Sequence, residues 1–172
     1  PGTQYAYALA AQIHRQRLLH RFVTGLAFGD NRRVWLPGRL QRRVVAGVPD
    51  SRLYRLPLNE LWALLHMRHG HMPLPVILER NRRFQLQIPH RLIEQSDAVI
   101  GFDTSSWLLA DRAHAAGKPF LLDASIAHPL EKEAIYRQLR QEFPQWQQEL
   151  EAKDSHSISL EQQEMEKADR IV

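Results

Sequence analysis

The chain has 172 residues, 44% of them hydrophobic and 24% charged, which is the ordinary composition of a globular domain with a sizeable core. It contains no cysteine, so a disulfide framework, a thiolate metal site and a cysteine nucleophile are excluded. No apolar run approaches the roughly 18–20 residues that a membrane-spanning helix needs.

The net charge of +4 conceals an asymmetry between the two halves of the chain. Residues 1–90 hold 14 Arg and Lys against 4 Asp and Glu, whereas residues 91–172 hold 9 against 15. A basic half is typical of proteins that bind phosphate, nucleic acid or an anionic membrane, and equally of an Arg-rich solvated surface. Charge alone leaves both interpretations open.

The first 28 residues predict a turn, a helix and a strand. Residues 1–17 combine a glycine turn with a helical pattern, for which Thr3 can serve as the N-cap. Such a turn exposes backbone N–H groups at the positive end of a helix, which suits phosphate binding or a simple entry into the helix. Phe22–Leu26 predicts the first strand.

An irregular, Arg-rich stretch covers residues 29–51, within which Leu40–Ala46 predicts a short helix. Leu53–Leu56 alternates apolar and basic residues and stops at Pro57, which predicts a short strand near a sheet edge.

Two helical segments come next. The first, Leu58–His69, carries an apolar stripe that we expect to face the core, formed by Leu58, Leu61, Trp62 and Leu65. The second covers residues 74–95 and is interrupted at Pro89.

Three histidines, His66, His69 and His71, lie close together at the end of the first of these helices. No carboxylate accompanies them at zinc-ligand spacing, so the pattern favours a helix C-terminus that stops at Gly70. No metal site and no cofactor are predicted.

The clearest pattern in the chain is a strand–helix–strand unit. Asp97–Phe102 predicts a buried strand that ends in the polar residues 103–106, and Trp107–Ala116 predicts a helix with Gly117 as its C-cap. Phe120–Leu122 predicts the next strand. The residues expected to face the core from the helix are Trp107, Leu108, Ala110 and Ala113.

The remaining chain is mostly helical and polar. Leu130–Glu142 and Pro144–Lys153 predict helices, and Ser157 or Ser159 can cap a final helix that ends at Ala168. Ile171-Val172 predicts the start of a strand.

Strands that alternate with helices predict an α/β fold, with a Rossmann-like parallel sheet and helices on both faces. In such sheets, ligands bind outside the carboxyl ends of the strands. This rule selects three groups of candidate substrate-binding or catalytic residues that would share one rim: Gly2 and Thr3; Asp103, Thr104 and Ser105; and Asp123, Ser125 and His128.

Three pieces of the sequence, in this order, resemble the N-terminal half of retaining glycosyltransferases of family 4 (group 1). They are the glycine turn that opens a small-residue helix at residues 1–4, the unit Asp97–Ala124 with its Gly117-Lys118-Pro119, and the acidic helix that ends in Ala168-Asp169 before a strand. The likeness is close from about residue 96 onward. In that family the glycine turn follows a strand and usually carries paired glycines, whereas only Gly2 stands here.

The resemblance implies the GT-B architecture, in which two Rossmann-like domains face each other across a cleft. Residues 1–172 would form a single N-terminal, acceptor-side domain of a longer protein, and the C-terminal, donor-binding domain would lie outside this sequence. The protein would transfer a sugar from a nucleotide diphosphate sugar to a glycan or lipid-linked acceptor in polysaccharide biosynthesis, and this part alone would be inactive. The resemblance also implies a cytoplasmic location, with peripheral contact at the inner face of the membrane.

Many members of the family carry a histidine after the strand equivalent to Phe120–Leu122, and it contacts the transferred sugar or the acceptor. By direct spacing that position is Ser125 here, and His128 lies three residues later. If the loop curls back, His128 can take that position, and His128 is the predicted catalytic residue; the alternative interpretation is a surface histidine beside Pro129. Ser125 or His128 would take the sugar-contacting role.

Two other classes of function remain as alternatives. One is a non-enzymatic Rossmann-like module that binds an anionic partner through the basic half, but no stacking pattern or recognition helix points to nucleic acid. The other is a dinucleotide-dependent oxidoreductase, which requires a G-x-G-x-x-G turn that the sequence lacks.

Overall fold

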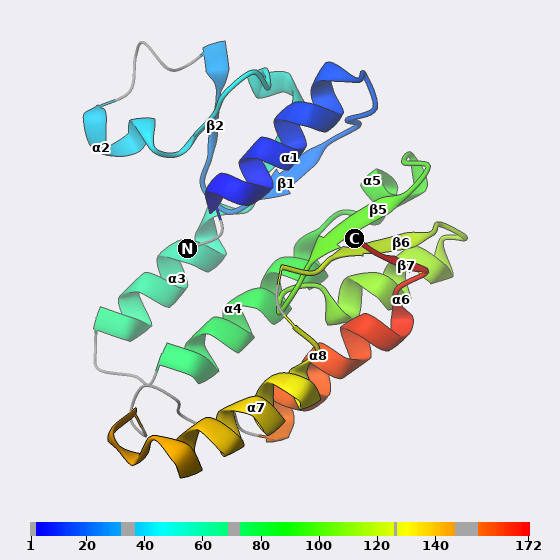
Figure 1. Cartoon of the computed structure of the whole chain (residues 1–172). Coiled ribbons are helices and arrows are strands. Elements are labelled where there is room, and N and C mark those ends of the chain that lie inside the picture. Colours follow the sequence, from blue (N-terminus) through cyan, green and yellow to red (C-terminus); the bar gives the residue numbers. More distant parts are fainter. Residues whose placement is uncertain (1–2, 32–36, 69–72, 126, 147–154) are drawn as a thin grey trace. The chain divides into compact units, whose positions relative to one another are not determined.

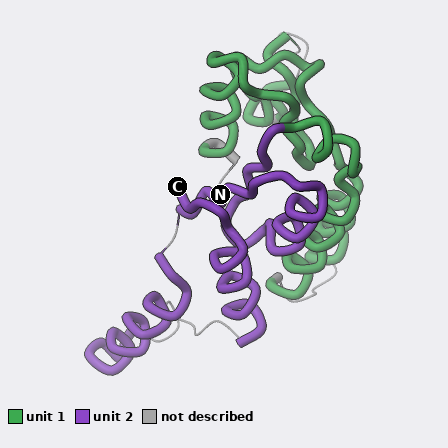
Figure 2. Tube along the Cα trace, turned by 90° about the vertical axis from the view of Figure 1, so that its right-hand side faces the viewer, with its two compact units in different colours: residues 1–96 green, residues 97–172 purple. Residues whose placement is uncertain are grey.

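The computed structural model describes residues 3–31, 37–68, 73–125, 127–146 and 155–172. These residues form helices and short parallel strands, so the predicted mixed α/β class is confirmed. The chain divides into two compact units, residues 1–96 and residues 97–172 (Figure 2). No helix in the described part of the chain is both long and apolar enough to cross a membrane.

The first unit contains two pairs of short parallel strands. Strand β1 (Phe22–Thr24) pairs with β4 (Leu53–Arg55), and β2 (Phe28–Gly29) pairs with β3 (Val44–Val45) (Figure 1). The strand predicted over Phe22–Leu26 is present but shorter. The helix predicted over Leu40–Ala46 is wrong, because helix α2 (Gly38–Gln41) ends before the valines. Two adjacent β-branched residues favour a strand over a helix, and that preference prevails here.

Helix α1 (Thr3–Arg15) covers this region with small side chains, as its sequence predicts. Tyr7 and Ala10 are buried in a cluster with Ala27, Val45 and Leu53, and the Tyr7 ring meets the Phe22 ring edge to face. Small residues on the inward face of a helix allow its backbone to approach the strands closely.

Asp50 connects the two strand pairs. It begins the 3-10 turn η2 (Asp50–Arg52), accepts a hydrogen bond from the backbone N–H of Gly29 at 2.9 Å, and forms an ion pair with Arg55. A Cβ atom at position 29 would overlap the backbone of Asp50, so only glycine fits there. Arg55 in turn donates to the carbonyl oxygen of Ala27 at 2.6 Å.

The predicted core stripe of helix α3 (Pro57–Arg68) is wrong. Leu58, Leu61 and Leu65 are 72%, 50% and 58% exposed, and the buried residues of the helix are Asn59 and Ala63. Helix α3 instead packs against helix α4 (Pro73–Gln87). The side-chain amide of Asn59 donates a hydrogen bond to the side-chain oxygen of Gln87 at 2.9 Å. The predicted interruption at Pro89 is confirmed, since helix α5 (His90–Glu94) starts directly after it.

The second unit contains the strand–helix–strand pattern that the sequence predicts. Strand β5 (Val99–Phe102), helix α6 (Trp107–Ala115) and strand β6 (Phe120–Asp123) follow one another, and β7 (Arg170–Ile171) completes a parallel sheet in the order β5-β6-β7 (Figure 1). Val99 lies opposite Phe120, and Leu122 lies opposite Ile171. The strand predicted to start at Ile171 therefore starts at Arg170.

Helix α6 ends in a two-bond Schellman cap at Gly117. The N–H of Gly117 donates to the carbonyl of His114, and the N–H of Lys118 donates to the carbonyl of Ala113. Gly117 has a φ of 67°, in the left-handed region, so the predicted C-cap glycine is confirmed.

The core of the second unit lies between the sheet and helices α6 and α8. Phe120 and Leu122 are fully buried, and the buried residues of α6 are Trp107, Leu109, Ala110 and Ala113. Leu109 takes the place predicted for Leu108.

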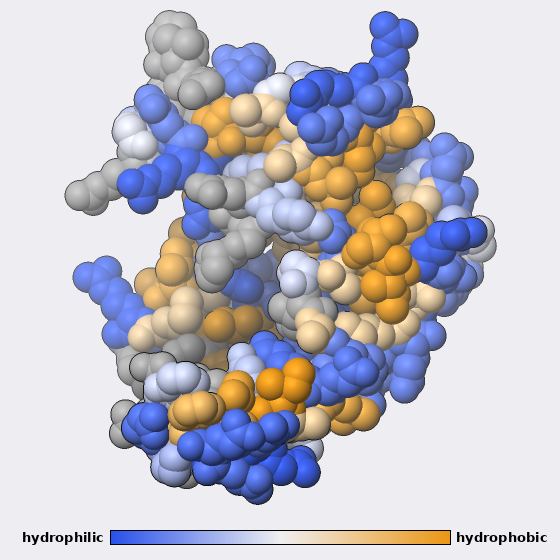
Figure 3. Space-filling model, viewed as in Figure 1, coloured by the Kyte–Doolittle hydropathy of each residue, from blue (hydrophilic) through white to orange (hydrophobic). Residues whose placement is uncertain are grey.

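Two longer helices complete this unit, α7 (Pro129–Glu142) and α8 (Ser155–Lys167), with a short 3-10 turn η3 (Pro144–Trp146) after α7. The helix predicted over Pro144–Lys153 lies partly outside the described residues. The predicted capping by Ser157 or Ser159 is wrong, because α8 already begins at Ser155 and buries Ser157. Figure 3 shows apolar atoms on the surface of α7, bordered by hydrophilic ones, and Leu130 and Ile135 are exposed there.

Candidate functional site

The carboxyl ends of β5 and β6 bring three of the predicted site residues together. The backbone N–H of Asp103 donates to the carbonyl oxygen of Asp123 at 3.2 Å, which extends the pairing of the two strands by one residue. The Ser125 hydroxyl lies 3.0 Å and 3.3 Å from the two carboxylate oxygens of Asp103 and donates to them. The Asp103–Ser125 pair lies at the surface, whereas Asp123 is buried.

The turn after β5 is shaped by a strained residue and by local hydrogen bonds. Thr104 has a φ of 64°, which is rare for a β-branched side chain. The Ser105 and Ser106 hydroxyls both donate to the carbonyl oxygen of Phe102, at 2.9 Å and 3.0 Å. Strained backbone is often found at functional sites, where the surrounding structure must hold it in place.

A buried carboxylate that sequence reasoning missed holds this turn in place. Glu164 of α8 is 1% exposed and accepts hydrogen bonds from the backbone N–H groups of Thr104, at 2.6 Å, and Ser106. The Ser106 hydroxyl, whose single proton is shared with the carbonyl oxygen of Phe102, lies 3.1 Å from the same carboxylate. These N–H groups lie at the start of α6, where the helix dipole favours a negative charge.

Burial raises the pKa of Glu164 from its ordinary value of 4.5 to about 7, because a low-dielectric environment disfavours the charged form. The hydrogen bonds from Ser106 and Thr104 act in the opposite direction, and the nearby charge of Asp103 raises the pKa further. The backbone N–H groups of Thr104 and Ser106 are thus used inside the fold. A substrate contact from Thr104, as predicted, would have to come from its side chain or its carbonyl oxygen and not from its N–H group.

A second carboxylate fixes the opposite end of the same unit. Asp169 accepts a hydrogen bond from the backbone N–H of Phe120 at 2.7 Å, and its carboxylate lies 3.0 Å from Nε2 of His114. The bond from Phe120 and the contact with His114 lower the pKa of Asp169. Glu164 therefore connects α8 to the turn between β5 and α6. Asp169, directly before β7, connects that segment to the start of β6.

His128 is placed at the surface, directly before α7. It occupies the N-cap position with a φ of −49° and a ψ of 132°, and its side chain makes no capping bond. Its imidazole forms no hydrogen bond with any residue in the described ranges. Asp103 is hydrogen-bonded by Ser125 and not by His128.

The remaining predicted site residues belong to the first unit. Gly2 and the side chain of Thr3 lie outside the described residues, and Thr3 is the first residue of α1. The shared rim of Gly2, Thr3 and the strand ends therefore stays a prediction.

The histidine tract is only partly described. His66 lies with Nδ1 2.9 Å from the carbonyl oxygen of Trp62, one turn earlier in α3, while His69 and His71 lie outside the described residues. Among the side chains that the structure describes, no three His, Cys, Asp or Glu residues are grouped so that they could hold a metal ion.

No protein-family model, curated protein or solved structure matches the chain. The class that its fold and site define is a mixed α/β protein with short parallel sheets and polar side chains at the carboxyl ends of two neighbouring strands.

Proposed function

We propose that this chain is the acceptor-side, N-terminal, Rossmann-like domain of a family 4 retaining glycosyltransferase of the GT-B architecture. The observation that carries the proposal is the exposed Asp103–Ser125 pair at the carboxyl ends of adjacent parallel strands. This is where open α/β sheets bind ligands. A carboxylate and a hydroxyl are also the groups that recognise sugar hydroxyls by hydrogen bonding.

The acidic motif of the resemblance gives further support. Glu164 and Asp169 belong to the helix-to-strand segment that resembles the family, and both bind backbone N–H groups of the strand–helix–strand unit. The acidic side chain at each of these two positions therefore has a structural role, which is to accept backbone hydrogen bonds.

In the proposed reaction, the bond between the anomeric carbon and the diphosphate oxygen of a nucleotide sugar breaks. The acceptor oxygen forms a new bond to that carbon with retention of configuration, and the proton of the acceptor hydroxyl passes to an oxygen of the leaving diphosphate. Negative charge grows on the nucleoside diphosphate, where helix N-termini and Arg or Lys of the second domain can stabilise it. Asp103 and Ser125 would orient the acceptor hydroxyls, with Thr104, Ser105 and Asp123 beside them, and His128 would contact the transferred sugar.

The proposed acceptor is a glycan or a lipid-linked sugar, and the proposed location is the cytoplasm, with peripheral contact at the inner face of the membrane. The basic character of residues 1–90 suits an anionic surface.

The first test uses the full-length protein encoded by the parent gene, titrated with a panel of nucleotide diphosphate sugars in calorimetry. We expect one of them to bind and to be consumed in the presence of a glycan acceptor. A parent gene that encodes an unrelated domain after residue 172, or a full-length protein that binds no member of the panel, would overturn the proposal.

We expect Asp103→Asn in the full-length enzyme to lower kcat/KM for transfer about tenfold or more, because a charge-assisted hydrogen bond to the acceptor is lost. Initial rates of transfer and of donor hydrolysis, measured in parallel, check this, and hydrolysis should change less than transfer. Asp111→Asn is the matched control, because Asp111 is an exposed carboxylate that pairs with Lys167 at 2.8 Å. If kcat/KM for transfer fell equally in the two variants, Asp103 would not contact the acceptor.

The alternative, an anionic-partner module that acts through Arg80, Arg82 and Arg83, has less support. Arg83 pairs with Glu79 at 2.7 Å and lies over the Trp62 ring, and Arg80 donates to the neighbouring Asn81. These contacts engage the Arg80 and Arg83 guanidinium groups within the α3–α4 pair.

A further inference from the structure

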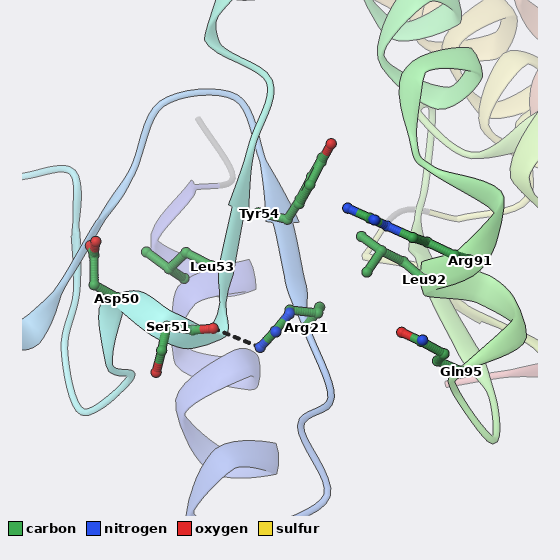
Figure 4. Close-up of a pocket in the computed structure, with 8 residues that line it drawn as sticks. All are labelled: Arg21, Asp50, Ser51, Leu53, Tyr54, Arg91, Leu92 and Gln95. Carbon is green, nitrogen blue, oxygen red and sulfur yellow. Dashed lines mark hydrogen bonds between the residues drawn. The ribbon is translucent and has the colours of Figure 1, made fainter.

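A polar hollow lies in the first unit, and none of its lining residues belongs to the candidate site at the ends of β5 and β6. It has a volume of about 320 Å³, near the lower end of the range typical of small-molecule sites. Its walls come from the residue before β1, from the start of β4 and from α5: Arg21, Ser51, Leu53, Tyr54, Arg91 and Gln95 contribute. In Figure 4, Arg91 and Gln95 extend from α5 toward Tyr54 and Arg21, while Asp50 points away from them.

One of the two guanidinium groups is held in place by the fold. Arg21 donates from one terminal nitrogen to the carbonyl oxygen of Ser51 at 2.6 Å, as the dashed line in Figure 4 marks. A guanidinium has five N–H donors in a rigid plane, so the others remain available to a ligand. Fixing the side chain in advance reduces the entropy that a ligand would otherwise have to offset.

Three further polar side chains at the hollow have no partner in the part of the chain that the structure describes. Within the described residues, no hydrogen bond or ion pair reaches the Arg91 guanidinium, the Tyr54 hydroxyl or the Gln95 amide. The one carboxylate at the wall, Asp50, accepts from the Gly29 N–H and pairs with Arg55, so its charge is compensated. The hollow therefore combines two positive charges with further donors and an apolar floor at Leu53 and Leu92.

We propose that this hollow binds a small organic phosphate. Arg21 and Arg91 come from two different elements and would each take oxygens of the phosphoryl group, which has enough acceptors for two guanidinium forks. Tyr54 and Gln95 would add a hydroxyl and an amide, and Leu53 and Leu92 would contact the organic part.

This site differs from the proposed acceptor site. Arg21 precedes β1, and Leu53 and Tyr54 open β4, so the hollow lies at the amino ends of these two strands. Its ligand would thus be an additional one, and the inference does not depend on glycosyl transfer.

The test is a titration of the chain with phenyl phosphate at low ionic strength, followed by the amide NMR signals of residues around the hollow. We expect saturable binding with a Kd of about 1 mM or tighter, with shifts at Arg21, Ser51, Tyr54 and Gln95. Arg91→Gln should weaken this binding at least tenfold. Arg91 is exposed and without a partner among the described residues, so we expect the variant to fold.

Arg68→Gln is the matched control, since Arg68 is an exposed arginine of the same unit that does not line the hollow. The proposal is overturned if phenyl phosphate fails to bind at about 10 mM, or if both variants weaken it equally. If benzoate binds as tightly as phenyl phosphate, the hollow does not select a phosphate over a carboxylate. If binding occurs only to vesicles that contain phosphatidic acid, the ligand is a lipid headgroup and not a soluble organic phosphate.

Discussion

Replacing Glu164 with alanine is expected to lower the free energy of unfolding of residues 97–172 by about 3 kcal/mol or more, because the backbone N–H groups of Thr104 and Ser106 lose this acceptor. The Ser106 hydroxyl also lies 3.1 Å from this carboxylate, but it keeps the carbonyl oxygen of Phe102 as an acceptor when Glu164 is removed. Each unsatisfied buried polar group costs about 1–3 kcal/mol, and the removed side chain also leaves a cavity.

Amide hydrogen exchange measures this effect directly, because the protection of β6 amides reports the opening of this unit. Glu166→Ala is the matched control, since Glu166 is an exposed glutamate on the same helix. We expect its effect to remain within about 0.5 kcal/mol. Similar losses of protection in the two variants would show that Glu164 contributes no more than a surface residue.

The raised pKa of Glu164 predicts a specific dependence of stability on pH. The folded form holds its proton up to about pH 7, whereas the unfolded chain releases it near the ordinary value of 4.5. Between these values the folded state binds more protons, so stability falls as pH rises from about 4.5 to about 7. The expected loss is on the order of 3 kcal/mol across this window.

Glu164→Gln keeps the shape of the protonated side chain but cannot ionise, so this part of the pH dependence should disappear. Protection of the β6 amides, measured from pH 4 to pH 8 in the original and variant chains, gives the comparison. The two chains differ only at residue 164, so contributions from all other groups cancel in the difference. If the difference between the two chains were the same at every pH, Glu164 would not titrate in the expected range.

Gly101→Ala is expected to destabilise the same unit by about 2–3 kcal/mol, because strand β5 has no room for a side chain at this position. A Cβ atom there would come within 2.5 Å of the Ser106 hydroxyl oxygen and 2.6 Å of the buried Phe120 ring. Phe120 is fully buried, so it cannot move aside without disturbing the core.

Gly38→Ala is the control for this substitution. No described atom lies within 4 Å of a Cβ built at Gly38, and the residue starts a short helix, so we expect no destabilisation. Thermal unfolding of both variants checks the pair. Equal melting temperatures would mean that the sheet and α6 can separate at Gly101 at little cost.

The strand–helix–strand unit could be predicted almost to the residue because its signals are local. An apolar run, a helical pattern and the Gly117-Lys118-Pro119 stop lie next to one another in the sequence. The structure has β5 over Val99–Phe102 and α6 over Trp107–Ala115, within two residues of the predicted bounds. The neighbouring strand ends that carry Asp103 and Asp123 follow from parallel pairing alone.

The missed features depend on partners far away in the sequence. Periodicity located the leucine stripe of α3, but it could not show that the opposite face, with Asn59 and Ala63, pairs with α4. Glu164 is separated from Ser106 by 58 residues, so no local pattern links them. The buried residues Ser157, Glu161 and Glu164 share one face of α8 at spacings of four and three residues, but all three are polar, so no apolar stripe marked this face as buried.

The contact between Glu164 and the β5–α6 turn has a consequence for folding during synthesis. The β5, α6 and β6 segments leave the ribosome first, but the carboxylate that satisfies the Thr104 N–H comes 60 residues later. Asp169, which binds the N–H of Phe120, comes 49 residues after it. On a nascent chain that ends before these residues, the unit would lack both contacts and its third strand, and it would expose apolar surface. Residues 97–172 therefore have to acquire their stability late in translation, as one cooperative step rather than strand by strand.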